Sequence, residues 1–281
     1  GGHSLFLKSD STVWASGGNA YGQLGNGTIN SSDVPLQVNV LTGIIAIAVG
    51  WEHCLALKSD STVWAWGRNN FGQLGTGLIT NSTIPLKINS LTAVTAISAG
   101  AFHSLVIKSD STVRTWGRNN RGQLGNGNTI DRNIPVLAIS LAGIIAVAGG
   151  YEHSLALKND NTVLAWGWNN YGQLGNGNFS DTILPAPAVT VTGIIAIAGG
   201  FGHSLALKND GTVWTWGWNL YGELGNGTFN DNNVPTQINS FTGIIAIAAG
   251  GGMHSIALKN NGTVWVWGRN SYGQLGDGTN N

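Results

Sequence analysis

The chain has 281 residues, of which only 9% are charged, and its formal net charge is zero. A chain this neutral gives no electrostatic attraction to nucleic acid or to an anionic membrane, so we expect neither as a partner. Hydrophobic residues make up 42% of the sequence, which excludes a disordered chain. No apolar run reaches the roughly 18–20 residues that a membrane-spanning helix needs, so we expect no membrane insertion.

One sequence pattern recurs six times, and each copy starts at one of the six histidines. The first five copies are spaced by 50 residues, and the sixth comes one residue late, after an insertion in 250–253. A period of this length is typical of a propeller or a solenoid. We therefore predict a single domain, 1–281, built of six tandem repeats, the first and last of them partial.

Each period contains four predicted strands, which in the second copy cover 44–50, 53–58, 62–67 and 84–88. The Asp60-Ser61 pair and its counterparts predict a hairpin turn between the second and third strands. A proline, here Pro85, recurs in the fourth strand, and a residue without an amide donor belongs on an edge strand.

Along these strands large side chains face one way and small ones the other, with little polar alternation. Such strands are covered on both faces, as in propeller blades that stack around an axis. No segment shows the 3.6-residue period of a helical solenoid, and the coils of a flat β-solenoid are usually shorter. We predict an all-β fold: a β-propeller of four-stranded antiparallel blades, about six of them, with incomplete blades at the seam and 22 strands in total. The alternative is a piece of a longer array.

The segment 200–225 combines Gly-x-x-His-Ser-Leu-Ala-Leu-Lys with Asp-Gly-Thr-Val-Trp-x-Trp-Gly-x-Asn and a Gly-x-Leu-Gly ending, here Gly222 to Gly225. This string resembles the regulator-of-chromosome-condensation repeat, and the resemblance covers the whole chain. The Trp-Asp pair of WD repeats is absent, and the separated Tyr and Trp of kelch repeats are not matched.

The resemblance implies a β-propeller of four-stranded blades, usually seven. Members of that family include an exchange factor for a small nuclear GTPase, ubiquitin-ligase and photoreceptor propellers, and secreted bacterial enzyme inhibitors. This chain departs from the pattern in blade number and has no insertion long enough to act as an exchange-factor wedge. Its low charge and Asn/Thr-rich turns look more like bacterial surface or secreted members, so we expect an extracellular or cell-surface location in a bacterium.

Residues that could carry chemistry recur identically in the copies, which favours structural roles. The histidines would lie far apart in a ring and have no companion ligands at metal spacing. Asp60 and its counterparts are turn formers, the Gly-x-Leu-Gly glycines suit positive φ, and Cys54 stands where other copies have Ser. We therefore expect no enzyme activity, no cofactor and no metal site.

The copies differ mainly at one end of the blades, because the first–second and third–fourth connections leave from the same end of an antiparallel meander. We call this end the aromatic rim. Its side chains are of the types enriched at protein-binding hot spots. The predicted partner-binding residues are Trp51, Glu52, Arg68, Phe102, Arg118, Arg121, Tyr151, Glu152, Trp168, Phe201, Trp218 and Arg269.

The leading prediction is a non-catalytic scaffold that binds a protein partner through the aromatic rim. One alternative is a lectin-like propeller that binds carbohydrate at each repeated aromatic turn. Another is a structural repeat segment of a larger bacterial surface protein. Self-association through open edge strands at the seam is a further possibility that the sequence leaves open.

Overall fold

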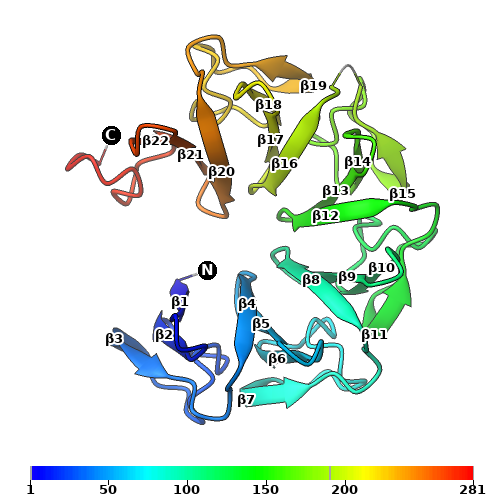
Figure 1. The fold of residues 1–281 in the computed structure, drawn as a ribbon, viewed down its shortest axis with the longest axis vertical. Helices are drawn as coiled ribbons and strands as arrows, with labels where there is room; N and C mark the ends of the chain where they lie inside the picture. The colour runs from blue at the N-terminus through cyan, green and yellow to red at the C-terminus, as the bar shows by residue number, and fades with distance from the viewer. Residues whose placement is uncertain (1, 190, 281) are drawn as a thin grey trace.

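The computed structural model describes residues 2–189 and 191–280; Gly1 and Asn281, the predicted ends of the domain, lie outside the described residues. Within this part the regular structure consists of 22 strands in six antiparallel sheets, which surround a central axis (Figure 1). The protein is a six-bladed β-propeller, and the prediction of an all-β propeller is confirmed. None of the described residues forms a helix that could span a membrane.

Each blade is a meander whose strands follow one another in chain order, and blades 2 to 5 run from the axis outwards (Figure 1). Blade 1 has three strands, β1 (His3–Leu7), β2 (Val13–Gly17) and β3 (Ser32–Gln37). Blade 6 also has three, β20 (Ile244–Gly250), β21 (His254–Lys259) and β22 (Val264–Gly268). Blade 2 has four strands, β4 (Ile44–Val49), β5 (His53–Lys58), β6 (Val63–Gly67) and β7 (Ser82–Lys87). Blade 3 has β8 (Val94–Ala99), β9 (His103–Lys108), β10 (Val113–Gly117) and β11 (Arg132–Leu137). Blade 4 has β12 (Ile144–Gly149), β13 (His153–Lys158), β14 (Val163–Gly167) and β15 (Thr182–Pro187). Blade 5 has β16 (Ile194–Gly199), β17 (His203–Lys208), β18 (Val213–Gly217) and β19 (Asn232–Gln237).

In blade 2 the inner three strands match the predicted ranges to within one residue at each end. The outer strand β7 begins two residues earlier than predicted, because Gly67 pairs with Ser82 beyond an irregularity in the ladder. The prolines do occupy the outer strands, as predicted; they are Pro35, Pro85, Pro135, Pro185 and Pro235.

A tryptophan near the end of the third strand joins each blade to the one before it. The Trp116 side chain is 0% exposed, and its Nε1 donates a hydrogen bond of 2.8 Å to the Gln73 carbonyl of the preceding blade. The ring fills a socket above Gly75, where φ is +69° and a Cβ would lie only 2.7 Å from Nε1. The same donor reaches the preceding blade at all five interfaces; the tryptophans are Trp66, Trp116, Trp166, Trp216 and Trp267.

Each of the five interfaces between consecutive blades also encloses an apolar cluster. Between blades 4 and 5, for example, Leu155 and Leu157 of one blade pack with Ala206 and Trp216 of the next. Large side chains thus meet small ones from blade to blade, as the alternation in the sequence predicts.

A histidine-to-serine contact accompanies each tryptophan. His103 Nε2 lies 2.9 Å from Ser154 Oγ in the next blade, and that hydroxyl donates to the Gln123 carbonyl at 2.8 Å. Since the serine proton is used in the second bond, Nε2 must carry the proton of the first. The prediction of a structural histidine is confirmed, although its partner is a strand side chain of the next blade rather than a neighbouring loop. In blade 2 the acceptor is the buried Cys54, which confirms that residue as a small core side chain.

Burial keeps these histidines neutral. It lowers the pKa of His53, His103, His153 and His203 to about 3 and that of His3 to about 4. An imidazolium would need water or an anion in this position, and the ring instead packs against glycine. At Gly100 a Cβ would lie 2.1 Å from the His103 ring, so only glycine fits there.

The turns at the other end of the blades are held by aspartates, as predicted. The Asp10 carboxylate accepts hydrogen bonds from the backbone N–H and the hydroxyl of Thr12, and the hydroxyl bond above all lowers the pKa of Asp10 to about 2. The counterparts make the same pair of bonds; they are Asp60, Asp110, Asp160 and Asp210. The loop glycines Gly22 and Gly25 have positive φ, also as predicted.

Replacing a socketed tryptophan should destabilise the ring strongly. We expect Trp216→Ala to lower the free energy of unfolding by roughly 3–5 kcal/mol, because it removes a fully buried ring and leaves the Gln173 carbonyl without its indole donor. Trp214→Ala in the same strand removes a half-buried ring outside the socket and should cost much less. Urea unfolding followed by circular dichroism measures both, and equal losses would contradict the socket's role.

Stability should fall on acidification from pH 7 to pH 5. The unfolded chain binds protons on its histidines below pH 6.5, whereas the buried rings do so only near pH 3. Because the unfolded state then carries more protons, stability rises with pH across this window, by at most about 1.4 kcal/mol per pH unit for each such histidine. Burial raises the pKa of Glu152, Glu223 and Asp231, and these three groups oppose the trend.

The control for this pH dependence is His103→Asn. In this variant the free energy of unfolding should rise less steeply with pH, because one fewer proton is taken up on unfolding, whatever its stability at pH 7. Urea titrations at half-unit pH steps provide the slope. An unchanged slope would show that His103 is already protonated in the folded state.

Candidate functional site

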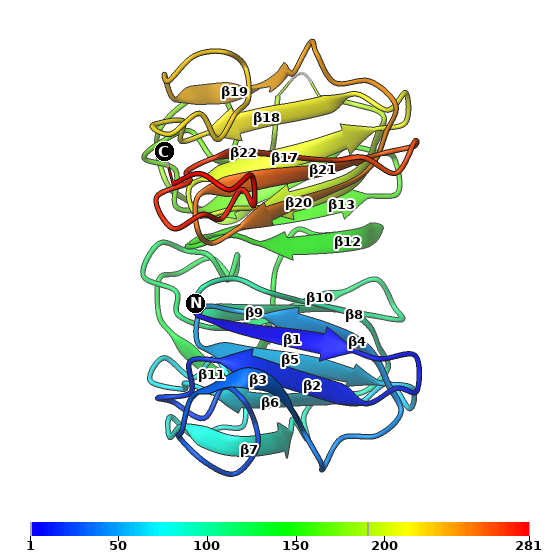
Figure 2. The same cartoon turned by 90° about the vertical axis from the view of Figure 1, so that its left-hand side faces the viewer.

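The strand pairings bring the variable turns to one end of each blade. In blade 2, Val49 pairs with Cys54, His53 with Gly67, and Gly67 with Ser82. The first–second and third–fourth connections therefore emerge together, at the end of the ring that we call the aromatic rim. Figure 2 shows the blades from the side, with their strands running between the two ends.

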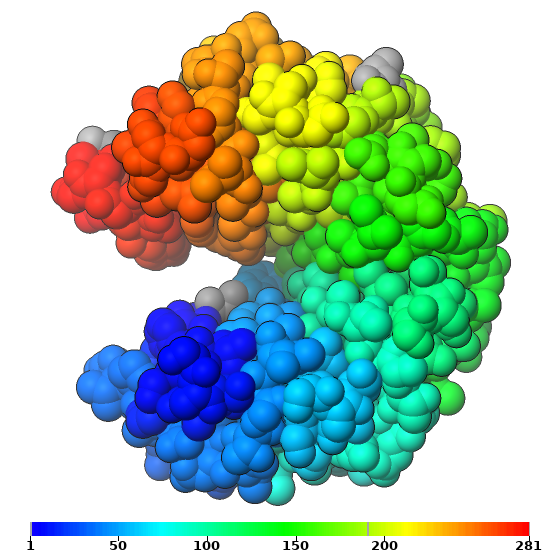
Figure 3. All heavy atoms as spheres, viewed as in Figure 1, coloured from blue at the N-terminus to red at the C-terminus, as the bar shows by residue number. Residues whose placement is uncertain are grey.

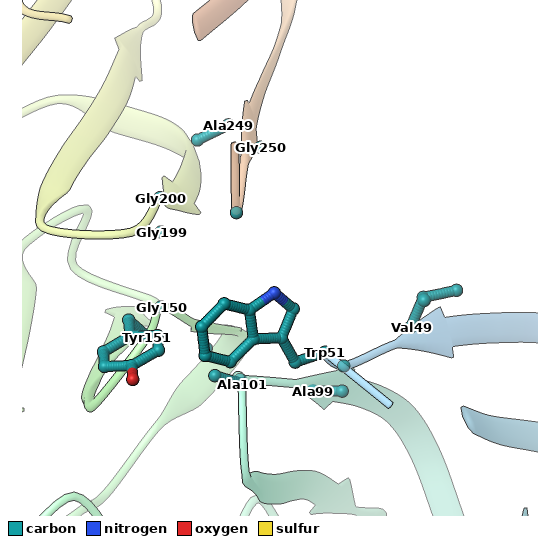
Figure 4. A pocket seen from close by; sticks show the side chains of 14 residues that line it. Val49, Trp51, Ala99, Ala101, Gly150, Tyr151, Gly199, Gly200, Ala249 and Gly250 are labelled. Carbon is teal, nitrogen blue, oxygen red and sulfur yellow. The ribbon is translucent and has the colours of Figure 1, made fainter. Parts of the chain in front are cut away.

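Four aromatic rings from blades 2 to 5 meet near the axis. Trp51 contacts Phe102 and Tyr151, with ring centroids 5.3 and 5.0 Å apart. Tyr151 stacks on Phe201 at 4.3 Å. Figure 4 shows the Trp51 indole reaching across the axis towards the Tyr151 side. These residues, which lie about 50 positions apart in the sequence, thus form one continuous cluster.

Further rings extend this cluster outwards over blades 4 and 5. The ring centroids of Trp168 and Tyr151 are 6.1 Å apart, and those of Trp218 and Phe201 are 5.4 Å apart. Tyr171 stacks almost parallel on Trp218, with ring centroids 4.6 Å apart and an angle of 9° between the ring planes. Trp168 and Trp218 remain half-buried. The rim therefore presents partly exposed indole faces that are already fixed by their neighbours, so little side-chain entropy is lost on binding.

Three arginines of the rim, Arg68, Arg118 and Arg121, lie over blades 2 and 3, and their charges are paired within the protein. Arg68 binds Glu52 at 2.6 Å, and its guanidinium lies 4.9 Å from the Tyr21 ring centre. Arg118 binds Glu152 at 2.8 Å. The rim thus divides into a sector of ion pairs and a sector of tryptophans.

Glu152 is the most deeply placed charge of this network. It is 6% exposed, and it also lies near Arg121, which binds Asp181 at 3.2 Å. Burial raises the pKa of Glu152, and the positive charges of Arg118 and Arg121 oppose that rise. A carboxylate that is desolvated but paired on two sides holds the arginines in place rather than acting as an acid.

A cavity of about 300 Å³ lies on the axis beneath the Trp51 ring. Its walls are the glycine and alanine ends of the innermost strands, joined by backbone bonds such as Trp51 N–H to the Ala101 carbonyl at 3.1 Å. None of the residues that line it is charged. Among the described residues, no three His, Cys, Asp or Glu side chains come close enough to hold a metal ion.

The structure gathers most of the predicted partner-binding residues into this network of contacts, but Glu152 is only 6% exposed and two further residues differ in position. Phe102 is only 6% exposed, so it supports the cluster from below. Arg269 lies in blade 6, where it packs over the Tyr221 and Tyr272 rings, 5.2 and 5.4 Å from their centres.

Two residues outside the predicted set, Phe71 and Tyr171, also belong to the network. Phe71 supports Arg118, whose guanidinium lies 5.0 Å from its ring centre, while Tyr171 supports the tryptophans. The signal was present in the sequence, because both stand at the same repeat position as Arg121. The repeat alone does not show whether that position folds into the core or joins the rim.

Comparison with protein families assigns the whole fold. Residues 1–250 match the RCC1-like domain, and residues 244–274 match the regulator of chromosome condensation (RCC1) repeat. The chain belongs to the RCC1 repeat family. Comparison with curated protein sequences gave no significant match.

Solved structures of this family have the same fold. Human WBSCR16 is similar with a TM-score of 0.86 and 26% identity, over 99% of this chain and 77% of that one. Yeast RCC1 (Prp20), solved with Kap60 bound, gives a TM-score of 0.83 and 25% identity, over 95% and 68% of the two chains. Prp20p of Saccharomyces cerevisiae gives a TM-score of 0.72 and 22% identity, over 89% of this chain and 79% of that one.

The two rim glutamates should differ in their effect on stability. Glu152→Gln removes a charge from a buried pair, so we expect a loss of roughly 1–3 kcal/mol in the free energy of unfolding. Glu52→Gln is the matched control, because the Glu52 side chain is 28% exposed against 8% for Glu152 and should cost less. Urea unfolding in low and high salt gives both values; a larger loss at Glu52 would overturn the ranking.

Proposed function

We propose that this propeller is a non-catalytic scaffold that binds a protein partner through the aromatic rim. The observation that carries the proposal is the continuous ring cluster, in which half-buried Trp168 and Trp218 present indole faces held by Tyr171 and Phe201. Fixed aromatic side chains at the centre of a surface are the residues that contribute most to protein–protein binding.

The family supports a binding role. Yeast RCC1 (Prp20), which is 25% identical to this chain, was solved bound to Kap60. The work on S. cerevisiae Prp20p describes its binding to Gsp1p and histones. A propeller of this kind therefore serves in related proteins as a platform for protein partners, and we extend that coarse role to this chain.

The chemistry of the rim favours a partner with an apolar contact surface. Arg68, Arg118 and Arg121 are already paired with carboxylates of the protein itself. Their charges offer little free attraction to an acidic partner, whereas the tryptophan sector remains open. We expect binding to depend weakly on ionic strength for this reason.

The alternative of repeated carbohydrate sites has less support. A lectin-like propeller would need one separate stacking site in each blade. Here the rings contact one another across blades 2 to 5, which suits one partner that spans the rim. Calorimetric titration that showed several equivalent sugar sites per chain would replace the proposal with the lectin function.

Two finer points stay within this proposal. We infer an extracellular or cell-surface location in a bacterium, supported by the low charge and the Asn/Thr-rich turns of the sequence. We also infer that the three-stranded blades 1 and 6 are the incomplete blades of the ring, since they face each other across its opening in Figure 1.

The double variant Trp168→Ala/Trp218→Ala tests the binding role. Removing two half-exposed rings should reduce capture of the partner at least tenfold in a pull-down from cell extract, while the thermal midpoint moves by only a few degrees. Trp64→Ala/Trp214→Ala is the control, because it removes two half-buried tryptophans that lie near the opposite end of their strands. Full capture by the rim variant, or equal loss in the control, would count against the rim.

A further inference from the structure

A hollow lies between blades 2 and 3, where the third–fourth connection of blade 2 rests on the outer strand β11. The Gly77 N–H donates to the Asn133 carbonyl at 2.9 Å, and a Cβ on Gly72 would lie only 2.4 Å from the Asn133 Cα. In Figure 3 these two blades, in blue to green shades, pack side by side away from the opening of the ring. The hollow has a volume of about 350 Å³, and its lining residues are Asn70, Phe71, Ile79, Asp131 and Asn133.

The same backbone contact recurs between blades 3 and 4. The Gly127 N–H donates to the Ile183 carbonyl at 3.2 Å, and a Cβ on Gly122 would lie 2.7 Å from the Ile183 Cα. The loop of blade 3 therefore sits on blade 4 as the loop of blade 2 sits on blade 3. Side chains at the same repeat positions can be compared directly between the two interfaces.

An arginine of the chain itself occupies the equivalent place between blades 3 and 4. Arg121 stands at the repeat position of Phe71, and Asp181 stands at that of Asp131. Arg121 Nη1 donates to Asp181 Oδ2 at 3.2 Å. Between blades 2 and 3 the phenyl ring of Phe71 replaces the guanidinium, so Asp131 has no such donor.

Asp131 keeps one carboxylate oxygen available. Its Oδ1 accepts the Asn119 N–H at 2.7 Å, and the side chain is exposed. None of the ion pairs among the described residues includes Asp131. An ionised carboxylate can accept further hydrogen bonds at its second oxygen, and those from a charged donor are the strongest.

The walls of the hollow suit a long side chain with a charged end. Phe71 is half-buried and Ile79 is 63% exposed, so both offer apolar surface to a methylene stem. Asn133 donates its amide N–H to the Gly77 carbonyl at 2.8 Å, which leaves the amide oxygen as a second acceptor beside Asp131. A metal ion would need more carboxylates than the one that lines this hollow.

We propose that the hollow is the pocket for an arginine side chain of the protein partner, whose guanidinium binds Asp131 as Arg121 binds Asp181. Arginine suits the site better than lysine, because its planar fork reaches both a carboxylate and a neighbouring amide oxygen. The inference rests on the proposed function for the source of this side chain, a protein bound over the rim. It adds one basic side chain, at a defined place, to a partner surface that is otherwise apolar.

The positive charges near the hollow are already balanced. The guanidinium carbons of Arg68 and Arg118 lie 5.8 and 5.0 Å from the Phe71 ring centre. Each of these arginines is paired with a glutamate, at 2.6 and 2.8 Å. Arg121 approaches the same glutamate as Arg118, so the rim accommodates a further guanidinium close to Arg118.

Titration with the peptide acetyl-Gly-Arg-Gly-amide, followed by ¹⁵N NMR, tests the pocket. The amide signals of Asn119 and Asn133 should shift and saturate at millimolar peptide, the range expected for one side chain. Asp131→Asn should weaken binding at least tenfold. This variant keeps the bond to the Asn119 N–H, because Asn81 accepts the same bond in blade 2 at 2.8 Å.

Three controls make the result specific. The same peptide with citrulline, a neutral isostere of arginine, should bind at least tenfold more weakly. Phe71→Arg places a guanidinium of the chain itself in the hollow and should block the peptide. Asp181→Asn, which changes the filled site between blades 3 and 4, should leave the shifts of Asn119 and Asn133 unchanged.

Absence of saturable shifts at Asn119 and Asn133 would overturn the proposal. Equal binding of the citrulline peptide, or full affinity in Asp131→Asn, would overturn it as well. These outcomes are separate from the test of the rim: capture of the partner that is lost in Trp168→Ala/Trp218→Ala while the peptide fails to bind would keep the rim's role and remove the arginine pocket.

Discussion

The indole in the glycine socket is the interaction on which the structure depends. A single blade cannot bury either of its faces, so the ring is only as stable as the contacts between blades. At each of the five interfaces an indole fixes distance by its volume and orientation by its hydrogen bond to a backbone carbonyl of the preceding blade. The glycine at the base of the socket is required because its φ is positive and any Cβ would overlap the ring.

The histidine and serine side chains add direction to the same interface. The serine hydroxyl donates to the carbonyl that also receives the indole, so one backbone oxygen gathers bonds from two side chains of the following blade. The neutral histidine of the preceding blade completes the arrangement. Because all of these groups are buried, the interface depends on pH through desolvation rather than through an exchange of ion pairs.

The variable residues could diverge because they lie outside this framework. The backbone of the rim turns makes the hydrogen bonds between neighbouring blades, such as Trp51 N–H to the Ala101 carbonyl. The side chains of Trp51, Phe102, Tyr151 and Phe201 could therefore change from copy to copy without loss of these bonds. Their arrangement around the axis then brings together residues that no repeat contains by itself.

The sequence by itself determined the repeat, the strands, the edge prolines and the structural role of the histidines. These follow from local periodicity and from alternation of large and small side chains, which act within one blade and its neighbour. Only the tertiary structure decided that Phe102 is buried, that Tyr171 stacks on Trp218 and that Arg118 is paired with Glu152. Such contacts join residues that are distant in the sequence or depend on how turns fold over strand ends, and neither is encoded in a local pattern. The structure alone likewise shows that Val264 in blade 6 is 61% exposed although its counterparts in the other blades are buried.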